Sequence, residues 1–107
     1  MKPLNEILAT IDSCIERYEL QKLSLTHQQA EIARDLSTAL HWLTAHKIEY
    51  KKQWMSVWFN SKGKSEAQKE READFQVPEL YLIRNFMASG NKCLEVLRST
   101  ISAFKNG

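Results

Sequence analysis

Apolar side chains recur at three- and four-residue steps along three stretches of the chain, which is the spacing of one face of an α-helix. The first stretch runs from about residue 3 to residue 23, and Pro3 suits the opening turn of a helix. Its apolar positions are Leu4, Ile7, Leu8, Ile11, Cys14, Ile15 and Tyr18. We therefore expect a first helix over about 3–23 that buries this face.

The second stretch, from about residue 27 to residue 60, continues the helical spacing. Its apolar positions are Ala33, Leu36, Leu40, Leu43, Tyr50, Trp54 and Val57. Residues 60–64 that follow are polar, include a glycine and have no apolar period, which is typical of a loop. The pattern predicts a second helix over about 27–60.

The third stretch, about 66–105, has the most regular pattern. Ser65 and Gln68 have the spacing of a capping box that opens a helix. Apolar positions then follow in two seven-residue series, Leu80, Met87, Leu94 and Ile101 together with Ile83, Gly90, Leu97 and Phe104. Such a heptad predicts coiled-coil packing, and a glycine within it predicts the close approach of another helix. Pro78 predicts a kink or short break near residues 76–77.

These lengths predict a single all-α domain over 1–107 with three helices. The second and third helices form a long antiparallel, coiled-coil-like hairpin, and the shorter first helix packs on one end of it. The other end, about residues 48–77, is left as a two-helix arm. The arm has more large apolar side chains than one helix–helix seam can cover: Tyr50, Trp54, Val57, Trp58, Phe59 and Phe75. We expect these side chains to form an interface with a protein partner, first of all in a homodimer.

Composition narrows the class of protein. Of the 107 residues, 43% are apolar and 26% charged, which excludes wholesale disorder, and three glycines and two prolines are too few for an all-β fold. No apolar run has the length of a membrane span or the character of a signal peptide, so we expect a cytoplasmic protein with no membrane partner. Cys14 and Cys93 are expected to be small buried hydrophobes.

Charge is arranged in blocks along the chain. Residues 36–65 have five basic side chains against one acidic, whereas residues 66–79 have two basic against five acidic. The lysines of the first block stand among aromatic residues, a combination that suits single-stranded nucleic acid. The candidate nucleic-acid contacts are Lys47, Lys51, Lys52, Lys62 and Lys64. The alternative is that the aromatics are interface, the lysines solubilise a helix end, and the acidic block neutralises them.

Catalytic chemistry has no recognisable signature in this chain. The Gly-rich phosphate loops, the nucleophile elbow and the zinc-binding helix motif do not occur. His41 and His46 are five residues apart, which points them to different sides of a helix, and His27 is isolated. We expect no catalytic residue, no metal and no cofactor, and we predict that the protein is not an enzyme.

The sequence from Glu49 onward resembles the small helical-hairpin proteins that many tailed phages and prophages carry. The resemblance is one of cadence, in residues 49–52, 61–73 and 96–106. It implies a cytoplasmic accessory protein that binds DNA or another protein, and it assigns no functional residue. The sequence therefore predicts a non-enzymatic, self-associating interaction protein that uses its hairpin arm, with a nucleic-acid-binding accessory protein as the alternative.

Overall fold

The computed structural model describes residues 2–21 and 26–106, and the side chains of residues 2–20 and 27–103. The elements are the helices α1 (Leu4–Gln21), α2 (Thr26–Asn60), α3 (Glu66–Gln76) and α4 (Pro78–Asn106). No strand occurs within these described ranges, so the predicted all-α class is confirmed. The predicted number of three helices is wrong, because the third is divided into α3 and α4. The expected end of the first helix, at residues 22–23, lies outside the described residues.

The division falls at Val77. Its backbone leaves the helical region, with φ −127° and ψ 66°, and its N–H still donates to the Ala73 carbonyl to close α3. Pro78 has no N–H to continue the helical ladder and disfavours a helical conformation at the residue before it. It is instead the first residue of α4, where its missing N–H costs nothing. The break lies in the region where Pro78 predicts one, and it is complete enough to separate two helices.

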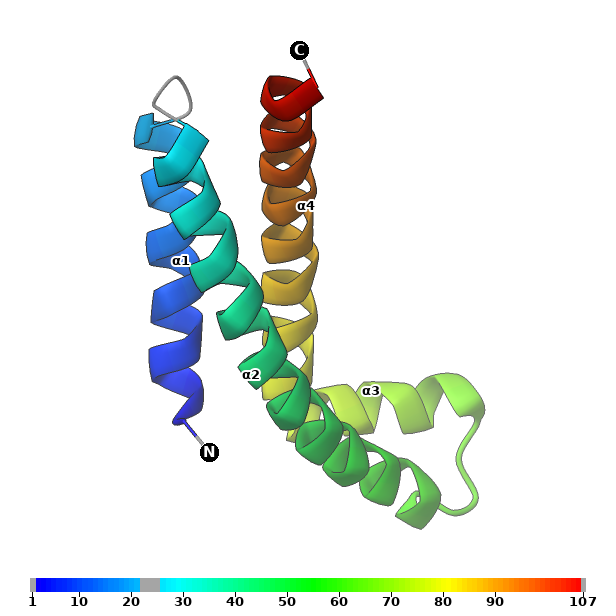
Figure 1. Cartoon of the computed structure of the whole chain (residues 1–107). Coiled ribbons are helices and arrows are strands. Elements are labelled where there is room, and N and C mark those ends of the chain that lie inside the picture. The colour runs from blue at the N-terminus through cyan, green and yellow to red at the C-terminus, as the bar shows by residue number, and fades with distance from the viewer. Residues whose placement is uncertain (1, 22–25, 107) are drawn as a thin grey trace.

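The four helices form a bundle with a side branch (Figure 1). α1 and α4 run in the same direction, and α2 runs in the opposite direction and packs against both. α3 projects sideways from the start of α4 and lies along the C-terminal part of α2, where it makes contact with α2 and α4 but not with α1. We call residues 48–77 the arm. The arm is therefore a two-helix unit outside the three-helix bundle.

The core of the bundle joins α1, α2 and α4. It consists of aliphatic side chains with two cysteines: Ile7, Leu8, Ile11, Cys14, Ile32, Leu36, Ala39, Leu40, Leu43, Ile83, Cys93, Leu94 and Leu97. Of the heptad of α4, Ile83, Leu94 and Leu97 belong to this core and Met87 packs against it. Leu80 is also buried and Ile101 is half-buried, outside this cluster. The Phe104 side chain lies outside the described part. The six apolar heptad side chains that the structure describes are thus buried or half-buried, and coiled-coil packing itself stays a prediction.

Gly90 lies where α4 meets α2. A Cβ atom added to it would stand 2.7 Å from Cδ2 of Leu40, a buried side chain of α2. That separation is much shorter than the van der Waals contact distance of two carbon atoms, about 3.5–4.0 Å. The Leu40 side chain thus occupies the space that the missing Cβ leaves, and the expected close approach of a helix at this position is confirmed.

Candidate functional site

The two tryptophans of the arm connect α2 to α3. Trp54 Nε1 donates a hydrogen bond of 2.8 Å to Asp74 Oδ1. The Trp58 ring lies under Lys69 Nζ, 4.5 Å from the ring centroid, and meets the Phe59 ring edge-on with centroids 5.2 Å apart. Both indoles are half-buried. They therefore hold the arm together while keeping part of each ring at the surface.

Tyr50 and Val57, which were predicted at a partner interface, lie on the inner side of α2. Tyr50 packs against the bundle core and its ring stacks near that of His46, with centroids 6.4 Å apart. Val57 is half-buried one turn before Ser61, which is buried. Val57 lies nine residues after Ile48, which places it on the opposite side of the helix from the exposed Ile48. Tyr50 is therefore occupied by contacts inside the chain, and Val57 is turned away from the exposed side of α2.

Phe75 is also separated from the other predicted residues. Its side chain is 87% exposed, although Ala73, two residues earlier, is fully buried. Two residues on a helix are about 200° apart, so Phe75 points to the side of α3 opposite its buried side. The structure thus does not bring Phe75 together with the tryptophans.

A different set of apolar side chains forms one exposed stripe on α2. Ile48, Met55 and Phe59 are spaced by seven and four residues and are 53%, 41% and 60% exposed. Beside them is a groove of about 360 Å³. The groove is lined by Trp54, Met55, Trp58, Phe59 and Glu70 of α3. We call the stripe and the groove the arm face.

Sequence reasoning identified only part of this arm face. It selected Trp54, Trp58 and Phe59 and missed Ile48, Met55 and Glu70. The spacing of Ile48, Met55 and Phe59 was a signal that could have found the stripe, because seven and four residues are close to whole numbers of helical turns. Glu70 had no such signal, since it reaches the groove only through the packing of α3 on α2.

The five predicted lysines differ in their pairing and exposure. Lys64 Nζ forms an ion pair with Glu72, and Lys52 Nζ lies 3.4 Å from Glu49 Oε1. Lys47 is half-buried, and Lys51 and Lys62 are exposed. The acidic block was expected to neutralise part of the basic one, and the contact between Lys64 and Glu72 is an instance of this.

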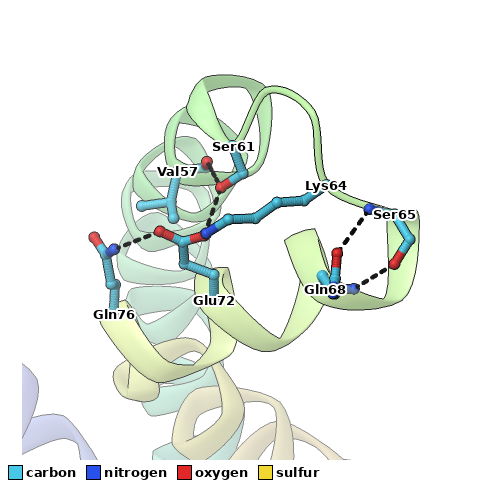
Figure 2. A network of polar contacts seen from close by, with 7 residues as sticks. All are labelled: Val57, Ser61, Lys64, Ser65, Gln68, Glu72 and Gln76. Atoms are coloured by element: carbon cyan, nitrogen blue, oxygen red, sulfur yellow. Dashed lines mark hydrogen bonds and ion pairs between the residues drawn. The ribbon is translucent and has the colours of Figure 1, made fainter.

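Polar contacts organise the loop between α2 and α3 (Figure 2). Ser65 and Gln68 form the predicted capping box: Gln68 N donates to Ser65 Oγ at 3.3 Å, and Ser65 N donates to Gln68 Oε1 at 3.1 Å. Gly63 has φ +82°, the left-handed region that favours glycine. On the other side of the loop, Glu72 accepts hydrogen bonds from Lys64 Nζ, from Ser61 Oγ at 3.0 Å and from Gln76 Nε2 at 3.3 Å.

The Glu72 contacts predict a pH dependence of stability. Hydrogen bonds from Lys64 and then from Ser61 hold the pKa of the Glu72 carboxyl below its ordinary value of 4.5. A carboxyl whose pKa is lower in the folded state binds more protons when unfolded. The stability it contributes is therefore present above pH 4.5 and is lost as the pH falls through the folded-state pKa.

We expect Glu72→Gln to remove this contribution, since glutamine keeps the shape but does not titrate. Chemical denaturation at several pH values between about 6 and about 3 measures it. Between those limits the free energy of unfolding should fall less in Glu72→Gln than in the unmodified protein. Equal losses in the two proteins would show that the Glu72 contacts do not persist in solution.

A second groove, of about 470 Å³, lies between α1 and α2. Three of its charged side chains form ion pairs. Arg17 Nη1 donates to Asp35 Oδ2 at 3.0 Å, and Arg34 Nε lies 4.0 Å from Asp35 Oδ1. Lys2 Nζ lies 4.4 Å from the centroid of the Trp42 ring. We interpret this groove as the seam that joins α1 to α2, because its charged groups bridge the two helices.

The cysteines and histidines are the remaining candidates for chemistry. Cys14 and Cys93 are free and buried, and burial raises the pKa of each thiol above its ordinary value of 9.0, so both stay protonated at neutral pH. This agrees with their expected role as small hydrophobes. Within the described ranges, no three His, Cys, Asp or Glu side chains are placed to hold a metal ion. His46 Nε2 lies 2.7 Å from the Lys2 carbonyl oxygen, and His27 and His41 are exposed.

Comparison of this chain with protein-family models, with curated proteins and with solved structures gives no match. Among residues 2–21 and 26–106, no helix has both the length and the apolar character that crossing a membrane requires.

Proposed function

We propose that this chain is a non-enzymatic interaction protein that self-associates and engages a protein partner through the arm face. The observation that supports this most strongly is the exposure of Ile48, Met55 and Phe59 beside the tryptophan-lined groove. The bundle core is assembled without these three side chains. Large apolar side chains that gather on one exposed face, rather than standing singly, mark an interaction site in many proteins.

A protein partner suits this face better than nucleic acid does. Stacking of bases needs free aromatic rings, but the Trp58 ring is flanked by Lys69 and by Phe59. Phosphate binding needs several free cations, but Lys64 and Lys52 are paired within the chain. Glu70 in the groove and Asp74 beside Trp54 add negative charge at the place where a nucleic-acid strand would have to lie.

The alternative, a nucleic-acid-binding accessory protein, is supported by the exposed Lys51 and Lys62 and by the exposed ring of Phe59. Both alternatives fit the accessory role that the phage resemblance suggests, and that origin stays a prediction, as does a cytoplasmic location.

Light scattering on the purified protein tests the proposal at about 50 mM and at about 500 mM salt, with and without a short single-stranded oligonucleotide. We expect a dimer at both salt concentrations that does not gain mass with the oligonucleotide, because apolar association persists in salt whereas phosphate contacts weaken steeply. A monomer that gains mass only with the oligonucleotide at low salt would replace the proposal with the alternative.

Met55→Glu should dissociate the dimer. A carboxylate in an apolar interface loses its hydration, and we expect the dimer dissociation constant to rise roughly a hundredfold. Leu82→Glu is the matched control, since Leu82 of α4 is 42% exposed against 41% for Met55 but lies outside the arm face. Sedimentation velocity measures both variants, and circular dichroism checks that each remains helical. Equal effects of the two substitutions would argue against the arm face as the interface.

A further inference from the structure

We infer that the partner on the arm face is a second copy of this chain with its α2 antiparallel to the first, so that Lys51 of each copy lies against Glu70 of the other. The inference rests on the proposed function and adds the orientation and the charge contact to it. It starts from the one charged residue that lines the groove, Glu70, and from the exposed lysine on the adjoining part of the same face, Lys51.

Lys51 belongs to the arm face by its position on α2. It follows Ile48 by three residues and precedes Met55 by four, so the three side chains share one side of the helix. In the part of the chain that the structure describes, Lys51 and Glu70 have no ion-pair partner within their own molecule. The adjacent Lys52, in contrast, is held by Glu49. Within that part of the chain, Lys51 is therefore an exposed, unpaired cation of this face that can reach another molecule, whereas Lys69 lies over the Trp58 ring.

Symmetry then relates the two charges. In a twofold dimer each surface contacts its own copy, so position i opposes position j and j opposes i. A twofold axis at Met55 and perpendicular to α2 exchanges residues 51 and 59, each about 6 Å from Met55 at about 1.5 Å per residue. Phe59 lines the groove together with Glu70. This arrangement thus brings Lys51 of one copy over the part of the groove in the other copy that Phe59 and Glu70 line.

The parallel arrangement has the opposite electrostatics. In that arrangement the twofold axis runs parallel to the two α2 helices and between them, so each residue of one copy lies level with the same residue of the other. Lys51 and Lys52 of one copy then lie level with the same two lysines of the other, and Glu70 of one copy lies level with Glu70 of the other. Like charges at close range destabilise an interface, so the charge pattern of the arm face favours the antiparallel dimer.

Charge exchange between the two positions tests the inference. Lys51→Glu alone and Glu70→Lys alone each convert both contacts of the dimer into repulsions, and we expect each to raise the dimer dissociation constant about tenfold. The double variant Lys51→Glu/Glu70→Lys restores both attractions and should return to within about threefold of the unmodified protein. Lys92→Glu and Glu95→Lys, at exposed positions of α4, make the same changes of charge as matched controls.

Mixing the two single variants gives a stricter test. In a mixed dimer, the carboxylate introduced by Lys51→Glu in one chain would face the ammonium introduced by Glu70→Lys in the other. The second contact would be the unmodified pair of Lys51 and Glu70, so both contacts are attractive. We therefore expect the mixture to form dimers at a concentration where each variant alone is monomeric.

Rescue on mixing requires a contact between molecules, which a change within one molecule cannot produce. The mixture of Lys92→Glu with Glu95→Lys should behave as the sum of its components. A mixture of the Lys51 and Glu70 variants that stays as monomeric as its components would contradict the antiparallel charge contact.

The outcomes separate this inference from the proposal beneath it. If Met55→Glu dissociates the dimer but the charge variants behave like their α4 controls, the arm face remains the interface and the antiparallel charge contact is wrong. If the unmodified protein is a monomer, or if Met55→Glu has no more effect than Leu82→Glu, both the inference and the self-association on which it rests are overturned.

Discussion

Gly90→Leu is expected to lower the free energy of unfolding by about 3 kcal/mol, the upper part of the usual range for overpacking a core. Even the first added carbon would stand 2.7 Å from Leu40 Cδ2, and 3.4 Å from Leu40 Cγ. Leu40 is buried in the core and has little room to withdraw. The larger side chain must therefore push α4 away from α2 or force Leu40 out of its rotamer. Chemical denaturation followed by circular dichroism measures the loss.

A second substitution tells overpacking at this contact from a general loss of stability. Leu40→Ala alone leaves a cavity and should destabilise by about 2–5 kcal/mol. Combined with Gly90→Leu, it empties the space into which the new leucine extends. The double variant should therefore be more stable than the sum of the two single losses predicts, by roughly 1–3 kcal/mol. Additive losses, or an unchanged stability of Gly90→Leu, would contradict the close packing of these two residues.

Leu97→Ala is the second substitution with a large expected effect. Leu97 is fully buried in the heptad of α4 and belongs to the core shared by α1, α2 and α4. Truncating its side chain to the Cβ atom should cost about 2–5 kcal/mol, which combines lost burial with the cavity left behind. A domain of this size has a total stability of about 5–15 kcal/mol, so the variant should unfold at a clearly lower denaturant concentration.

The neighbouring residue provides the control. Val96 is 40% exposed, and Val96→Ala should change the free energy of unfolding by no more than about 0.5 kcal/mol. The two substituted residues are adjacent along α4, but Leu97 faces the core and Val96 faces the surface. Similar losses in both would mean that α4 does not pack through its heptad positions.

The break at Val77 connects the fold to the proposed function. A continuous third helix would have kept residues 66–76 in line with α4. Instead, α3 turns away from α4 at Val77 and lies along α2 (Figure 1). This places Asp74 against Trp54 and Lys69 against Trp58. It also places Glu70 in the groove. The arm face is thus a product of the turn at Pro78 as much as of the apolar residues on α2.

The local features of this protein could be predicted from its sequence. Helical period identified the buried faces of α1, α2 and α4, since every third or fourth residue of a helix returns to the same side. The capping box at Ser65 and the break near Pro78 were predictable as well, because each depends on neighbouring residues alone. The error was in the number of helices: the segments on either side of the predicted kink or break were counted as one helix, whereas Pro78 starts a separate helix, α4.

The composition of the arm face, in contrast, was decided by the tertiary structure. Tyr50 and Val57 were grouped with Trp54 and Trp58 because all are large and apolar, but which side of α2 is covered depends on where α3 packs. The same packing leaves Phe75 pointing outward and brings Glu70 to the tryptophans. Sequence spacing describes the side of one helix on which a residue lies. Only the contact between two helices determines whether that side is buried, exposed or charged.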